Sequence, residues 1–65
     1  MDKIYYTAIF TEKVTGKQLY RLHDAPLNKF FWEKEKLRIM DKIIKDRFID
    51  RHEIEINDLG PDKHV

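Results

Sequence analysis

The sequence predicts an α+β fold of order ββαβ, in which one long helix packs on a three-stranded antiparallel sheet. Three observations predict it. Two segments rich in β-forming residues, 3–11 and 18–23, flank a turn. Apolar residues then recur at helical spacing over residues 28–50, and residues 53–58 alternate between polar and apolar. Because 65 residues suffice for one domain at most, we expect a single domain over residues 1–65.

The first two segments are expected to form a hairpin over residues 3–23. Alternate residues of the first segment fall on opposite sides of an extended chain, and both sides could be covered. One side holds Ile4, Tyr6, Ala8 and Phe10, and the other holds Tyr5, Thr7 and Ile9. Gly16 can supply the positive φ of the turn. In the second segment Tyr20 and Leu22 share a face, while the opposite face is half polar.

The helix is expected to begin at Asn28, because Pro26 cannot donate a hydrogen bond to a strand ladder and interrupts the sheet. An N-cap at Asn28 places Leu27 and Trp32 at the two positions that a hydrophobic staple would join. A competing interpretation starts the helix at Asp24, with Pro26 in its first turn.

Apolar side chains cover about half of the helix circumference, which is more than a small sheet needs. The stripe expected to face the sheet consists of Phe30, Leu37, Met40, Ile44 and Phe48, and a second lobe consists of Trp32, Ile39 and Ile43. We expect the second lobe to meet a partner surface, most economically a second copy. Phe31 and Ile49 lie among basic residues on the far side and are predicted to be exposed.

After the helix, which is expected to run over residues 28–50, the alternating residues 53–58 predict a half-buried strand. Residues 59–65 are predicted to be a flexible tail. A chain this small buries only about 60% of its unfolded surface and usually needs help to be stable. It has no cysteine, which excludes disulfides and thiolate metal sites, so self-association is the expected source of that help.

The charge balance predicts neither a nucleic-acid binder nor a strongly acidic protein. There are 13 Lys and Arg against 12 Asp and Glu, a formal net charge of +1. Non-specific nucleic-acid binding depends on a basic field that this balance does not supply. The first residues, Met1 to Lys3, do not open a secretion signal, and the apolar runs are too short for a membrane span. We therefore expect an intracellular soluble protein.

The residue inventory argues against an enzyme. The chain has neither Cys nor Ser, the two commonest nucleophiles. His23 beside Asp24, and His52 beside Glu53 or Asp50, could tune an imidazole, but such neighbours seldom converge on one substrate. A metal site would need His23, His52 and His64 to meet with a carboxylate, which is not expected. No catalytic residue, metal site or cofactor is predicted.

One segment nevertheless resembles a known family. The residues Thr15 to His23, TGKQLYRLH, are followed after a short loop by an aromatic helix start at Phe30–Trp32. This arrangement resembles the small dimeric uracil-DNA glycosylase inhibitors of Bacillus phages. Those proteins have a hairpin, a helix and a further strand, form homodimers, and block the DNA-binding face of the glycosylase. In them, aromatic side chains at the helix start enclose an apolar residue of the enzyme, while carboxylates stand in for phosphates.

The resemblance implies a partner-binding surface at the helix start and the adjoining sheet edge. Its residues would be Phe30, Phe31, Trp32, Glu33, Glu35, Tyr20 and Arg21. Two positions depart from the family's pattern: Arg21 replaces an acidic residue, and Glu35 replaces a second aromatic residue one helical turn after Phe31. The pocket would therefore be built from the aromatic run at residues 30–32, with Glu33 and Glu35 as flanking acids.

The expected function is thus a phage-type protein inhibitor of uracil-DNA glycosylase, acting as a homodimer in the host cytoplasm. One alternative is a small homodimeric interaction module with a different target. Another is a binder of single-stranded nucleic acid, which would use stacking rings beside a basic groove. Its residues would be Tyr5, Tyr20, Lys34, Arg38, Lys42 and Lys45.

Overall fold

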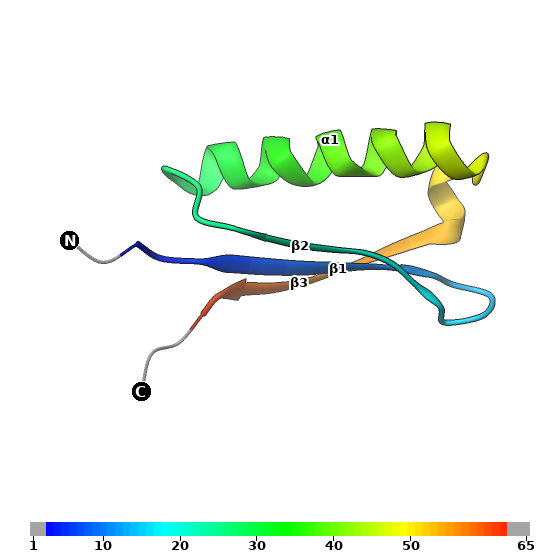
Figure 1. Cartoon of the computed structure of the whole chain (residues 1–65), viewed down its shortest axis with the longest axis horizontal. Helices are drawn as coiled ribbons and strands as arrows, with labels where there is room; N and C mark the ends of the chain where they lie inside the picture. Colours follow the sequence, from blue (N-terminus) through cyan, green and yellow to red (C-terminus); the bar gives the residue numbers. More distant parts are fainter. Residues whose placement is uncertain (1–2, 63–65) are drawn as a thin grey trace.

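A computed structural model describes residues 3–62 of the chain and confirms the α+β fold of order ββαβ. The strands are β1 (Tyr6–Glu12), β2 (Gln18–Asp24) and β3 (Ile54–Pro61). Helix α1 (Lys29–Arg47) follows β2, and a short 3₁₀ helix η1 (Arg51–Glu53) leads into β3. The helix lies along one face of the sheet, and the opposite face is not covered by any described element (Figure 1).

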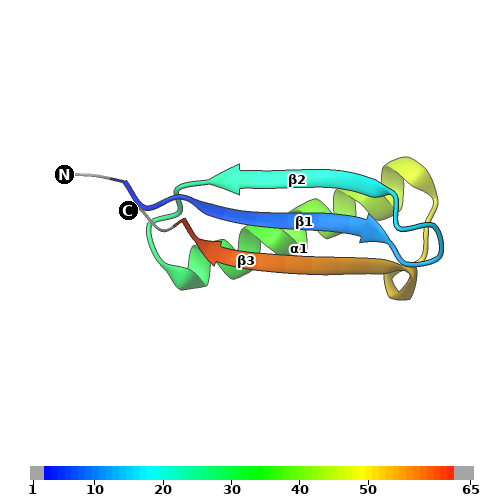
Figure 2. The ribbon, with the colours of Figure 1, turned by 90° about the horizontal axis from the view of Figure 1, so that it is seen from below.

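The sheet is antiparallel and has the order β2-β1-β3, so β1 is central and both other strands are edges (Figure 2). One bulge interrupts the β1–β2 pairing between Phe10 and Thr11, and another interrupts the β1–β3 pairing between Thr7 and Ala8. Gly16 takes a positive φ of 74° in the hairpin turn, as the sequence predicts.

The start of α1 was predicted correctly. Asn28 has extended dihedrals, and its side-chain oxygen accepts a hydrogen bond from the Phe31 N–H at 3.1 Å, which makes it the N-cap. The alternative start at Asp24 is wrong, because that residue ends β2. The expected staple is also wrong, since Leu27 is exposed while Trp32 is buried.

The ends of α1 and β3 differ from the prediction. The helix ends at Arg47 rather than at residue 50, because Phe48 adopts left-handed dihedrals and closes the helix by donating its N–H to the Ile44 carbonyl at 3.0 Å. Strand β3 covers 54–61 rather than 53–58, since β1 continues to pair with it up to Pro61. Three residues assigned to the tail therefore belong to the sheet; residues 63–65 lie outside the described part.

The face of α1 that packs on the sheet includes only Met40 and Ile44 of the expected stripe. The buried helix residues are Trp32, Ile39, Met40 and Ile43, which include the whole second lobe. Of the stripe expected to be buried, Phe30, Leu37 and Phe48 are exposed. The helix residues pack on Ala8, Phe10, Leu22 and Ile54 of the sheet. Besides Phe31, the exposed apolar residues of the helix are therefore Phe30 and Leu37 of the expected stripe rather than the second lobe.

Candidate protein-interaction site

Exposed apolar residues gather where the β2–α1 loop enters the helix. Leu27 is exposed, and Phe30 and Phe31 keep 65% and 45% of their surface accessible. We call these three residues the helix-start patch. The patch exists because the Asn28 cap fixes the direction of the first helical turn. In this direction Trp32 points into the core, whereas Phe30 and Phe31 remain at the surface.

The two phenylalanine rings pack against each other. Their centroids are 5.8 Å apart and their planes meet at 70°, an edge-to-face arrangement that aromatic pairs favour. The Lys34 ammonium lies 5.2 Å from the centroid of the Phe30 ring, within the range of a cation–π contact. The rings are therefore held in place without being buried, which is the state of a preformed docking surface.

A shallow hollow of about 430 Å³ lies beside the Phe31 ring. It is lined by Pro26 from the loop and by Lys34, Glu35 and Arg38 from the next turns of α1. The floor is apolar and the rim is charged. Such a hollow can receive one apolar side chain of a partner, with polar atoms around it to fix its orientation.

The two carboxylates predicted to flank the pocket are both engaged in ion pairs. Glu33 contacts Lys36 at 2.6 Å, and Glu35 contacts Arg38 at 2.5 Å. The site thus presents paired charges around apolar rings rather than a row of free carboxylates.

Trp32 lies in the core and not at the surface where the family resemblance placed it. Its ring is 1% exposed and packs against Tyr6 with centroids 5.2 Å apart. The indole N–H donates to an Asp58 carboxylate oxygen at 3.1 Å, so its polar atom is satisfied inside the fold. The prediction of Trp32 as a partner-binding residue is therefore wrong for this conformation.

Asp58 ties β3 to the first turns of α1, a role that the sequence did not reveal. It accepts a hydrogen bond from Trp32 and pairs with the Lys36 ammonium at 2.6 Å. Burial tends to raise the pKa of Asp58, but the bonds from Lys36, the Gly60 N–H and Trp32 outweigh it and lower that pKa below 3.8. The same contacts, with Glu33, outweigh burial and raise the pKa of Lys36.

Tyr20 and Arg21 do not join the helix-start patch. Tyr20 lies near the hairpin end of β2 and lines a different hollow together with Lys42 and Asp46 of α1. That part of the helix is roughly 16 Å from Phe31, by the rise of 1.5 Å per residue. Arg21 pairs with Ile9 in the register of β1 and β2, which directs it to the uncovered face of the sheet. The structure therefore does not bring Tyr20 and Arg21 together with the helix-start patch, and their part in partner binding stays a prediction.

The structure also separates the residues predicted for single-strand binding. Tyr5 stacks on His23 with ring centroids 5.1 Å apart, whereas Tyr20 packs edge-on against Phe10 in the core. His23 and Phe10 project to opposite faces of the sheet by the register of β1 and β2. The two tyrosines cannot stack successive bases of one strand.

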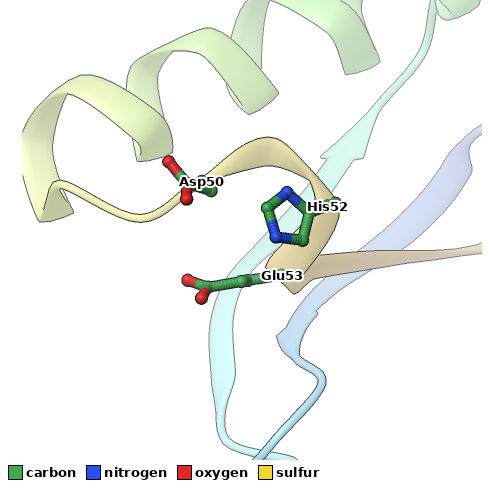
Figure 3. A group of neighbouring side chains, drawn as sticks. All are labelled: Asp50, His52 and Glu53. Atoms are coloured by element: carbon green, nitrogen blue, oxygen red, sulfur yellow. The ribbon is translucent and has the colours of Figure 1, made fainter.

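The three histidines do not converge within the described residues 3–62. His23 contacts the Thr7 hydroxyl at 2.9 Å on the sheet, while His52 lies in η1; His64 lies outside the described residues. His52 does lie near Asp50 and Glu53, with candidate ligand atoms within 4.8 Å of one another (Figure 3). All three belong to one exposed turn, where sequence proximity alone brings such groups together, so we assign no metal to them.

Compared with known protein families, curated proteins and solved structures, this chain matches none. None of the described helices is long and apolar enough to cross a membrane. The resemblance to the glycosylase inhibitors therefore stays a prediction, to be weighed against the geometry of the helix-start patch.

Proposed function

We propose that this protein is an inhibitor that binds uracil-DNA glycosylase through the helix-start patch, and that it has no catalytic activity of its own. The observation that carries the proposal is the pair of packed, exposed rings of Phe30 and Phe31 at the first turn of α1. The ββαβ order agrees with what the resemblance implies for the fold.

The proposed mechanism is the capture of one apolar side chain of the enzyme. That side chain would enter the hollow beside Phe31 and lose its contact with water, which makes it a hot spot. The strength of such a contact depends on desolvation and preorganisation rather than on net charge. This fits a chain whose net charge is only +1. The carboxylates of Glu33 and Glu35 would contribute orientation and association rate more than affinity.

We further propose that the active form is a homodimer. Phe30 and Leu37 lie seven residues apart on the side of α1 that the sheet does not cover, and they are 65% and 51% exposed. A second copy that packs its helix on this side would bury apolar area that one small domain leaves in water.

The test is the excision of uracil from DNA by the glycosylase in the presence of this protein. Wild-type protein should inhibit excision at a near-stoichiometric ratio. Phe31→Ala should weaken inhibition by roughly 30-fold, which corresponds to about 2 kcal/mol of lost binding. Phe48→Ala is the matched control, since it removes another exposed ring at the far end of α1. Circular dichroism should show that both variants keep the fold.

Two outcomes would contradict the proposal. Undiminished excision in the presence of excess wild-type protein would exclude the target. Equal inhibition by wild type and by Phe31→Ala would exclude the helix-start patch as the binding surface, even if the target is right.

A second candidate is an interaction module with another target, and one observation favours it. Two cations, Lys34 and Arg38, and one carboxylate, Glu35, line the hollow, so its rim is net positive, whereas a phosphate mimic is negative. A target whose apolar side chain lies next to a carboxylate would suit this rim. If the protein is stably folded but does not inhibit the glycosylase, the result would favour this second candidate.

A further inference from the structure

Strand β3 is an edge strand, and its outer side is open along its first half (Figure 2). Backbone pairing shows which groups face outwards. The Lys13 N–H donates to the Glu53 carbonyl at 2.9 Å, so this pair of residues is hydrogen-bonded. In an antiparallel ladder, hydrogen-bonded and non-bonded pairs alternate along the two strands. Phe10 and Ile56 form a non-bonded pair. Both the N–H and the C=O of Ile56 therefore point to the free edge.

The adjoining groups extend this free edge. The carbonyl of Ile54 also points outwards by the same alternation, while its N–H donates to the Arg51 carbonyl within η1. The bulge and the positive φ of Gly60 disturb the ladder only beyond Asp58. An open edge of this kind can accept another strand, and many proteins protect such edges with a charge or a proline at their centre. Here the centre is Ile56.

A hollow lies directly beside this edge, between β3 and α1. Its floor consists of Met40, Ile54 and Ile56, of which the first two are buried in the core. The floor is left uncovered because α1 crosses the sheet obliquely, from the β3 edge at its start towards β2 at its end (Figure 2). If another strand paired with this edge, its side chains on the helix side of the sheet would therefore contact apolar surface.

The rim of the same hollow carries two cationic side chains, Lys13 from the hairpin turn and Arg51 from η1. His52 of η1 also lines it, and all three side chains are exposed. Asp50 and Glu53 lie next to His52, so the positive charge of the rim comes from Lys13 and Arg51. They stand at the start of β3. In an antiparallel addition, the C-terminal end of the incoming strand lies there. The rim therefore fits a carboxylate at that end of the added segment.

From these features we propose that the edge of β3 at Ile54–Asn57 is a second binding site, which accepts an extended peptide segment by strand addition. The segment would carry apolar residues at alternate positions, facing the hollow, and an acidic residue at its C-terminal end, facing Lys13 and Arg51. Main-chain hydrogen bonds to Ile56 would set its register, and the alternate side chains would give specificity. This site is distinct from the helix-start patch.

A second copy of the chain fits this edge less well than an acidic peptide. In a symmetric pair of edges centred on Ile56, Ile54 would face Asp58 of the other copy. That carboxylate is already bonded to Trp32 and Lys36 within its own chain and is not free to meet the cationic rim. Charge complementarity therefore favours a partner that brings its own carboxylate.

The test uses the full chain and a hexapeptide, acetyl-Thr-Val-Thr-Val-Thr-Glu-amide, titrated while amide signals are followed by NMR. The Ile56 amide should shift on binding. It should exchange rapidly with solvent in the free protein and become protected in the complex, whereas the amides of Glu55 and Asn57, which face β1, should be protected in both states. A matched peptide that ends in Lys should bind about tenfold more weakly.

Charge reversal gives the sharper arm of the experiment. Arg51→Glu should invert the preference between the two peptides, while Lys29→Glu, an equal charge change at the other end of the molecule, should leave it unchanged. Ile56→Pro removes the outward N–H without removing a bond to β1 and should abolish binding. If that variant does not fold, the peptide preference of Arg51→Glu still tests whether the peptide binds at this edge.

Three results would overturn the proposal. The first is an Ile56 amide signal that does not shift at millimolar peptide. The second is equal binding of both peptides to the wild-type protein and to Arg51→Glu, and the third is protection of the Ile56 amide from solvent exchange that rises with protein concentration in the absence of peptide. The last result would mean that a second copy occupies the edge. None of these measurements depends on the glycosylase or on Phe31. The proposal of a binding site at the β3 edge can therefore be refuted without any effect on the proposed function.

Discussion

The exposure of single side chains at the helix start decides what this molecule can bind. Phe30, Phe31 and Trp32 are consecutive, yet only the third is buried, because successive residues of a helix point about 100° apart. The exposure of Phe31 follows from the sequence and is confirmed. Ile49 was predicted to be exposed for the same reason but packs against the core, since the chain leaves helical geometry at Phe48.

Phe48 combines two unfavourable features. Its φ of 55° lies in the left-handed region, and its side chain is 94% exposed. A left-handed conformation costs a non-glycine residue about 1–2 kcal/mol, whereas glycine adopts it readily. We expect Phe48→Gly to stabilise the protein by about 1 kcal/mol, measured by urea denaturation, since almost no buried surface is lost.

The control for this prediction is Phe48→Ala, which removes the ring but keeps the Cβ atom. It should leave the free energy of unfolding nearly unchanged. Equal stabilisation by both substitutions would show that the exposed ring, and not the backbone conformation, is the source of the effect.

At the scale of elements, the sequence pattern reveals each strand and the helix but not the side on which the helix packs. Two apolar arcs of similar width compete on α1, and hydrophobic periodicity alone does not separate them. The separation comes from tertiary contacts: Asp58 binds the Trp32 indole and the Lys36 ammonium, and this orients the first turns of the helix towards β3. No spacing rule in the sequence links residues 26 positions apart.

The orientation of α1 can be tested by comparing one residue from each arc. Ile39→Ala should lower the free energy of unfolding by about 2–4 kcal/mol, because Ile39 is 3% exposed and its loss leaves a cavity in the core. Leu37→Ala should lower it by less than about 1 kcal/mol. Urea denaturation at low protein concentration measures both without a contribution from self-association. Similar losses for the two variants would mean that the helix is rotated about its axis.

At the scale of the whole molecule, the fold class followed from alternation and helical spacing, whereas the candidate site was only partly predictable. Four of the seven residues assigned to the site, Phe30, Phe31, Glu33 and Glu35, lie together at the start of α1. Trp32, Tyr20 and Arg21 lie elsewhere because their positions depend on the packing of α1 and on the register of β1 and β2. Registers and packing directions are long-range properties, which local sequence does not determine.

The described residues 3–62 form only two layers. Among them, one sheet face, one helix face and two sheet edges are left uncovered (Figures 1 and 2). These surfaces are the ones that an associating protein would cover.

Self-association through the uncovered helix face leads to the last prediction. The sedimentation coefficient of the wild-type protein should rise with concentration towards that of a dimer. Leu37→Glu places a charge on the exposed side of α1 that also carries Phe30. Burial of this charge against a second copy would cost several kcal/mol, so the variant should remain monomeric at every concentration. Val14→Glu is the control, because Val14 is also apolar and exposed but lies in the hairpin turn. If Leu37→Glu forms a dimer as readily as the wild-type protein, the interface lies elsewhere. If the wild-type protein stays monomeric at high concentration, the proposed mechanism does not involve a dimer.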